Sequence, residues 1–319
     1  MKKRVLSTLS IILIGIMGIG SLPANAVTKD GLRTNDANEV IDITNDPNYS
    51  VTTGEISLKN IKFKTSGENK LILENKSRSK ETEKDIKNLQ KRLDEDKELR
   101  EFIYSRVSSG ANISNIGYSE TFVKVDEFNR TVPVTKKELS RDVMGDPSEY
   151  GKLTMYTFVE PMHYQGSLYV SAYTHASWSG WGDIIGKLGP AHGEDMISIS
   201  IPERFTRTFK KFWGEYAKPN KGDVKSRCTN DADRALIYAF DEVQVLTPSR
   251  NTYLDWVRIA TGSKTNSLTP RTDKYTSHYV HTYESMTISP TISSAGNINF
   301  GLSSSSKAWQ LSSSVNTEF

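Results

Sequence analysis

The feature that most constrains the fold is a period of two in the apolar residues between positions 152 and 201. Successive side chains of a β-strand point to opposite faces of a sheet, so this alternation is typical of strands with a buried face. Pro161 and Gly166 lie between the first two alternating segments, as expected of a connection. The centre of the chain therefore predicts strands at residues 153–159, 168–173 and 196–201.

Strand patterns on both sides of this region extend the prediction. Residues 121–126 and 131–135 flank a turn, and Pro133 marks the second of them as an edge strand because proline cannot donate to a sheet. Residues 298–302 and 309–319 alternate and predict a closing hairpin. Further strands are predicted at 235–246 and 277–288, and residues 251–261 are ambiguous.

Two segments carry helical spacing instead. In residues 76–107 the apolar side chains recur every three or four positions, and the acidic run Asp94–Asp96 divides them into two helices. Thr82 and Asp85 fit a capping box at the start, and Gly110 fits the end.

The second such segment, Glu203–Tyr216, places its aromatic residues on one side of a helical projection and its basic residues on the other. This pattern predicts an amphipathic helix packed on the core. A helix resting on a membrane surface is the alternative interpretation.

The first 26 residues have the pattern of a secretory signal peptide: a basic start, an apolar run of about 16 residues and the small-residue site Ala24–Ala26. The apolar run is shorter than the ~20 residues that a spanning helix needs, and we find no other run of that length. We therefore expect a secreted, extracellular protein with no transmembrane segment once the signal is removed.

The resulting organisation has three parts. Residues 1–26 are the signal, residues 27–110 form a charged, partly disordered and helical region, and residues 111–319 form a β-rich domain, with a linker at 142–151. The predicted fold class is mainly β: an antiparallel sandwich-like domain with one or two packed amphipathic helices, preceded by a helical or loosely ordered N-terminal segment.

Charge and cysteine content exclude several classes of protein. The signal contains three positive residues and no acidic one, so the net charge of +3 falls to about zero in the mature chain. A balanced charge gives no reason to expect nucleic acid as a partner. Cys228 is the single cysteine, so the chain has no intramolecular disulfide, and the residues near it in sequence include no base that would activate its thiol.

Local motifs of common enzymes are absent from the sequence. We find no His-Glu-x-x-His zinc helix, no Gly-x-Ser-x-Gly elbow, no phosphate-binding loop and no complete EF-hand. Residues 230–233 alternate carboxylates as a calcium loop does, but the glycine and the closing glutamate are missing. No metal and no cofactor are expected on these grounds.

One segment nevertheless combines reactive side chains with a loop that leads into a strand. His192 could act as a general base, with Glu194 or Asp195 orienting it. The competing interpretation is a polar loop in which Asp195 binds backbone N–H groups.

Aromatic residues suggest a second kind of site. Trp178 and Trp181 flank a Ser-Gly turn and would stack on sugar rings if both were exposed, and Tyr279, His281 and Tyr283 share one face of a strand that could stack on a ligand. Ordinary core packing explains both groups as well. His278 and His281 are three residues apart, so a strand places them on opposite faces and they cannot chelate one metal.

Three functions follow from these patterns. The first is a secreted non-enzymatic β-domain that binds an extracellular glycan, another surface polymer or a surface partner. The second is a pro-protein that loses residues 27–150 and releases a β-rich toxin or antimicrobial body. The third is a small extracellular hydrolase that uses His192 with Glu194 or Asp195.

Overall fold

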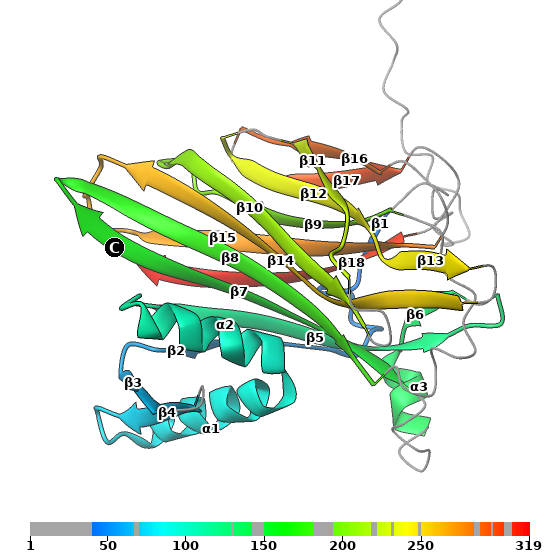
Figure 1. Ribbon diagram of the computed structural model, residues 1–319, viewed down its shortest axis with the longest axis horizontal. Coiled ribbons are helices and arrows are strands. Elements are labelled where there is room, and N and C mark those ends of the chain that lie inside the picture. Colours follow the sequence, from blue (N-terminus) through cyan, green and yellow to red (C-terminus); the bar gives the residue numbers. More distant parts are fainter. Residues whose placement is uncertain are drawn as a thin grey trace, which may run out of the picture. The chain divides into compact units, whose positions relative to one another are not determined.

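A computed structural model describes residues 40–66, 70–128, 130–141, 150–180, 194–217, 222–230, 233–247, 250–283, 288–294, 296–302 and 308–319. All of them belong to one compact unit, residues 37–319. The predicted fold class is confirmed, since two large, mainly antiparallel sheets form a sandwich (Figure 1).

The smaller sheet has six strands. Their order across the sheet is β1 (Val40–Asp42), β18 (Ala308–Glu318), β15 (Thr272–Thr282), β9 (Glu194–Ser200), β12 (Ala235–Asp241) and β11 (Ser226–Asn230). All neighbours are antiparallel except β1 and β18, which run parallel.

The larger sheet has eight strands. Its main order is β10 (Thr206–Tyr216), β14 (Arg250–Thr265), β8 (Ser167–Ser179), β7 (Gly151–Tyr164), β5 (Asn115–Val125) and β2 (Val51–Ser57). Two short strands join it at the side, β13 (Val243–Thr247) on β14 and β6 (Thr131–Pro133) on β5. The predicted hairpin with Pro133 on an edge strand is therefore confirmed.

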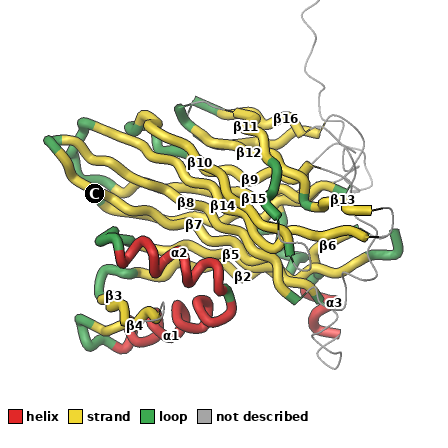
Figure 2. Tube along the Cα trace, in the orientation of Figure 1, coloured by secondary structure: helices red, strands yellow, loops and turns green. Residues whose placement is uncertain are grey.

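Both sheets are covered on their outer faces as well (Figure 2). The hairpin of β16 (Ile288–Ile292) and β17 (Ile298–Leu302) packs on the six-stranded sheet. Helices α1 (Lys80–Glu95) and α2 (Lys97–Ser108), with the hairpin of β3 (Ile61–Ser66) and β4 (Lys70–Asn75), pack on the eight-stranded sheet. The short helix α3 spans Lys136–Arg141. Because the central strands are buried on both faces, apolar residues occupy both the odd and the even positions of β7.

The helical pair is capped by side chains at each start. Ser79 accepts a hydrogen bond from the Thr82 backbone N–H (3.1 Å) and begins α1 three residues before the predicted cap. Asp96 accepts from the Leu99 N–H (2.8 Å) and begins α2. The acidic run thus separates two helices as predicted, because a carboxylate satisfies an unpaired N–H at a helix start.

The helix predicted over residues 203–216 is wrong, because this segment forms the edge strand β10. Its aromatic spacing fits a helix, but the backbone pairs along nearly its whole length with β14. Phe209 is 45% exposed on this edge, and its ring packs over Gly262 of β14. A Cβ atom added to Gly262 would lie only 2.1 Å from the nearest atom of that ring. Tertiary pairing has overridden the helical spacing.

Two further expectations differ from the structure. The closing hairpin does not form, since β17 pairs with β16 while β18 pairs with β15 and β1. Residues 40–75, expected to be loosely ordered, contain four strands. Two of these, β1 and β2, lie in the large sheets, so strands from both sides of residue 110, the predicted domain boundary, share the same sheets.

The two sheets come closest where β5 crosses β18. A Cβ atom on Gly117 would lie 1.9 Å from the Ser314 carbonyl oxygen, so no larger residue fits there without moving backbone. Ser119 Oγ donates to the Ser312 carbonyl and Asn115 Nδ2 to the Asn316 carbonyl (2.7 Å), which links the sheets on both sides of the crossing.

We expect Gly117→Ala to lower the free energy of unfolding by about 1–3 kcal/mol, because the added methyl group forces β5 and β18 apart. Urea denaturation measures this change. The matched control is Gly301→Ala in β17, where the nearest atom to the new Cβ is 3.6 Å away and little change is expected. Equal effects in the two variants would contradict the role given to the crossing.

Candidate functional site

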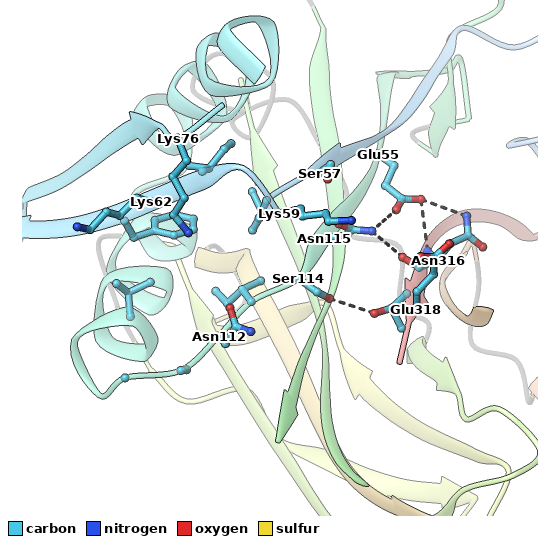
Figure 3. Close-up of a pocket in the computed structure, with 18 of the residues that line it drawn as sticks. Glu55, Ser57, Lys59, Lys62, Lys76, Asn112, Ser114, Asn115, Asn316 and Glu318 are labelled. Atoms are coloured by element: carbon cyan, nitrogen blue, oxygen red, sulfur yellow. Dashed lines mark hydrogen bonds between the residues drawn. The ribbon is translucent and has the colours of Figure 1, made fainter. Parts of the chain in front are cut away.

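A polar cleft of about 920 Å³ lies beside the β5–β18 crossing. It is bounded by the end of β2, the start of β3, the segment that follows α2, and the end of β18 (Figure 3). Its polar lining residues include Glu55, Ser57, Lys59, Lys62, Lys76, Asn112, Ser114, Asn115, Asn316 and Glu318.

One side of the cleft is basic. Lys59, Lys62 and Lys76 are exposed, and none forms an ion pair with a carboxylate in the described residues. Lys64 of the same hairpin differs, because its ammonium group is paired with Glu74. Lys62 and Lys76 lie together at one side in Figure 3, with Lys59 between them and the opposite wall. Three ammonium groups are therefore free to bind an anion.

The opposite wall is held by hydrogen bonds between three strands. Glu55 of β2 accepts from Asn115 Nδ2 of β5 (2.8 Å) and from the backbone N–H and Nδ2 of Asn316 on β18 (3.3 and 3.2 Å). Ser114 and Thr317 hydroxyls lie 3.2 Å apart next to them. These side chains are fixed in place, so the wall offers amide and carboxylate groups in a defined arrangement.

The chemistry of this cleft is that of binding. The lining includes the carboxylates of Glu55 and Glu318, and among the described lining residues there is no histidine or cysteine. Ammonium groups attract anions, and fixed amides and hydroxyls hydrogen-bond to hydroxyl groups, so these groups are suited to binding a polar ligand. Sequence reasoning missed this cleft because its lysines lie in a segment of low hydrophobicity. Only the fold shows that these lysines form no ion pair with a described carboxylate.

The sequence-predicted site residues lie elsewhere. His192 and Trp181 are outside the described residues, and so is part of the calcium-like segment at 230–233. Glu194, at the start of β9, forms an ion pair with Arg227 of β11 at the surface. Asp195, the next residue, points into the core. The hydrolase hypothesis stays a prediction.

Asp195 is the centre of a buried polar cluster. One of its oxygens accepts from Tyr279 OH (2.8 Å) and His281 Nδ1 (3.1 Å), and the other accepts from the Thr282 backbone N–H (3.0 Å). Trp178 Nε1 donates to Tyr279 OH (3.2 Å). The structure thus brings together residues from three candidate groups: Asp195, Trp178, and the pair Tyr279 and His281.

Glu242, at the junction of β12 and β13, completes this cluster. Its Oε2 atom lies 3.3 Å from the same His281 Nδ1. Sequence reasoning missed it, although the acidic pair at 241–242 interrupts an otherwise apolar run. Burial alone would lower the pKa of His281, but the charges of Asp195 and Glu242 outweigh burial and raise this pKa to about 10. Burial and the charge of Asp195 raise the pKa of Glu242.

The aromatic face is part of the core. Tyr279 and His281 are fully buried, Trp178 is nearly so, and Tyr283 meets the His281 ring edge-on. None of the first three presents a ring face to solvent, and the stacking role stays a prediction. His278 lies on the opposite face of β15, where its Nδ1 is 2.8 Å from Ser312 Oγ and its ring packs on Phe300, so the two histidines do not share a ligand, as expected.

A second buried histidine joins the helices to the sheet. His175 of β8 lies between Asp96 (Nε2 to Oδ2, 3.1 Å) and Arg258 (Nδ1 to Nη2, 3.2 Å). Because arginine only donates and a carboxylate only accepts, His175 is the neutral tautomer with its proton on Nε2. Burial lowers the pKa of His175, and the charge of Arg258 lowers it further against the opposing charge of Asp96.

No known protein family matches the chain, and no curated protein is detectably similar to it. Within the described residues, every helix is too short or too polar to cross a membrane.

Acid should destabilise the fold through its neutral histidines. Burial, only partly offset by the charge of Asp42, lowers the pKa of His278 to about 4, so between pH 6.5 and 4 the unfolded chain binds a proton there and the folded chain does not. Over this pH range the histidine lowers the free energy of unfolding by about 1.4 kcal/mol for each pH unit. We expect His278→Gln to make the fall in unfolding free energy from pH 7 to pH 5 shallower than in the wild type.

Urea denaturation at several pH values measures the slope. His163→Gln is the control, because His163 is exposed and should leave the slope unchanged. A His278→Gln slope equal to that of the wild type would show that His278 takes up its proton over the same pH range in the folded and the unfolded chain, and would contradict this prediction.

Proposed function

We propose that the protein is a secreted, non-enzymatic binding domain that holds an acidic extracellular polysaccharide in the polar cleft. The observation that carries this proposal is the set of three unpaired lysines, Lys59, Lys62 and Lys76, facing a wall of fixed amide groups. The lysines bind the carboxylate, phosphate or sulfate groups of the polymer, and the asparagines bind its hydroxyl groups.

The mixed character of the cleft explains why the ligand is a polysaccharide and not a simple anion. Glu55 and Glu318 lie on the side opposite Lys62 and Lys76 (Figure 3). A ligand that spans the cleft must offer anionic groups to the lysines and hydroxyl donors to the carboxylates. An acidic sugar polymer has both, and a cleft of about 920 Å³ accommodates a few of its units.

Secretion is part of the same proposal. The N-terminal 26 residues have the signal pattern, and Cys228 is the single cysteine of the sequence, so an intramolecular disulfide cannot form. Stability outside the cell then comes from packing, which the three apolar clusters of the sandwich supply.

The packing favours the full mature chain over a processed pro-protein. Loss of residues 27–150 would remove β2, β5 and β6 from the eight-stranded sheet and β1 from the other. It would also uncover Tyr156, Phe158 and Tyr173, which are buried under the helices, and would delete most of the cleft. An exposed apolar face of that kind promotes aggregation.

The intact mass of the protein recovered from the medium of cells that express it tests both points. We expect a species that begins at Val27 and keeps residues 27–150. A species that begins between residues 110 and 151 would establish processing and contradict the proposal, and protein retained in the cells would contradict secretion.

Binding to the cleft is tested with polygalacturonate, a carboxylate-bearing polysaccharide, and dextran, a neutral one. We expect the triple variant Lys59→Gln, Lys62→Gln, Lys76→Gln to bind polygalacturonate roughly tenfold more weakly than the wild type, because each exposed ion pair contributes about 0.2–1 kcal/mol. Its affinity should also depend less steeply on salt concentration. Titration calorimetry at two ionic strengths measures both effects.

The matched control is Lys80→Gln, Lys84→Gln, Lys87→Gln on α1, which makes the same change in net charge outside the cleft. Wild-type affinity in this control is expected. Equal losses in the two triple variants would show that net charge, and not the cleft, binds the polymer. Absence of polygalacturonate binding by the wild type, or equal affinity for dextran, would refute the acidic-polymer proposal.

A further inference from the structure

The buried cluster of Asp195, Glu242 and His281 has the arrangement of a metal site. One donor atom from each residue lies within 4.8 Å of the other two. The side chains come from β9, the β12–β13 junction and β15, so paired strands of one sheet hold at least two of the three ligands. All three residues are buried, with exposed fractions of 1%, 8% and 0%.

The cluster places two carboxyl groups against the same imidazole nitrogen. His281 Nδ1 faces Asp195 Oδ2 at 3.1 Å and Glu242 Oε2 at 3.3 Å. A single N–H cannot make a full hydrogen bond to two carboxylates, and two buried carboxylates close to one imidazole repel each other. A divalent cation between the three atoms would contact all of them and neutralise both carboxylates.

Among the described residues, the polar contacts of His281 are confined to this cluster. Its Nε2 atom is buried and has no hydrogen-bond partner, so every polar contact of a fully buried imidazole lies on the Nδ1 side. The rings around it are those of Trp178, Tyr283 and Trp309. An imidazole buried among aromatic rings is costly unless its inward nitrogen has a strong partner.

Asp195 is also oriented as a metal ligand is. Tyr279 OH and the Thr282 N–H fix its two oxygens, and Trp178 in turn holds the tyrosine hydroxyl. Hydrogen bonds of this kind around a ligating carboxylate orient it toward the ion. Entry is from the side of Glu242, whose side chain is 10% exposed.

We propose that Asp195, Glu242 and His281 bind one divalent transition-metal ion that links β9, β15 and the β12–β13 junction. Two carboxylate oxygens and one imidazole nitrogen, with no thiolate, suit Mn²⁺ or Zn²⁺ better than Ca²⁺, which takes oxygen ligands alone. The ion acts as a structural link, and this site is separate from the polymer cleft. Glu242 lies 47 residues after Asp195 and 39 residues before His281, so no local sequence motif identifies the site.

The test uses the full mature chain, stripped with a chelator and titrated with Mn²⁺ and with Zn²⁺ by calorimetry. We expect the wild type to bind one equivalent of at least one of these ions and to gain thermal stability in its presence. Glu242→Gln should bind about 10- to 100-fold more weakly, because a neutral amide oxygen replaces a charged carboxylate ligand. It keeps the size of the protonated carboxyl group, and near-ultraviolet circular dichroism checks that it is folded.

Glu194→Gln is the matched control, since it removes one carboxylate next to Asp195 in sequence but outside the cluster, and it should bind the ion as the wild type does. A wild type that binds neither ion, or a Glu242→Gln variant with wild-type affinity, would overturn the proposal. X-ray absorption of the loaded wild type gives a check that needs no variant. An imidazole nitrogen with oxygen ligands is expected, and a shell without imidazole would refute the site.

Discussion

The close approach of β5 and β18 at Gly117 is the contact on which the candidate binding site depends. Only a residue without a side chain allows the β5 backbone to lie against the Ser314 carbonyl group. The side chains of Ser119 and Asn115 then donate to β18 carbonyls on either side of the crossing. The sheets are therefore joined by hydrogen bonds at this edge, where most sandwiches are separated by a layer of side chains about 10 Å thick. The polar wall of the cleft, with Glu55 between Asn115 and Asn316, is a direct continuation of this seam.

The helical layer positions the remaining wall. Apolar contacts supply most of its binding to the sheet, and three pairs that span the interface define its placement: Arg92 with Glu120, Asp96 with His175, and Arg106 with Glu160. The two arginine–glutamate pairs are partly buried ion pairs, which contribute little net stability because desolvation opposes their attraction, and the third pair is a hydrogen bond between neutral His175 and Asp96. Such pairs therefore disfavour any shifted arrangement of the helices. They hold the segment after α2, residues 110–115, against the cleft.

The sequence was informative where a strand has a local signature. The alternation in residues 196–201 and the turn before Pro133 located strands correctly, because those patterns reflect the local pleat and turn. The aromatic spacing of residues 203–216 misled, since an edge strand exposes one side of its backbone and tolerates a spacing that also fits a helix. Residues 40–57 looked poor in core residues because their order comes from pairing with β18 and β5, which are distant in sequence.

The candidate sites show the same limit. Residue type alone drew attention to Asp195, Tyr279 and His281, but their contacts join positions more than 80 residues apart in sequence. The acidic pair at 241–242 stands out in an apolar run, but the place of Glu242 in the cluster depends on the register of β12 with β9. For Lys59, Lys62 and Lys76, the decisive property is that none forms an ion pair with a described carboxylate. Composition reports how many carboxylates a chain has, and only the fold reports where they lie.

The cleft and the buried cluster lie at opposite ends of one strand pair. β15 and β18 pair without interruption from Thr272 and Glu318, which line the cleft, to Thr282 and Ala308, which lie beside the cluster. The nine positions from Thr272 to His281 correspond to about 30 Å of extended strand. This exceeds the screening length of about 8 Å at physiological ionic strength, so a cation bound at the cluster would not alter the potential at the lysines. Any coupling between the two sites must pass through the shared strands, whose continuous register leaves them little freedom to shift.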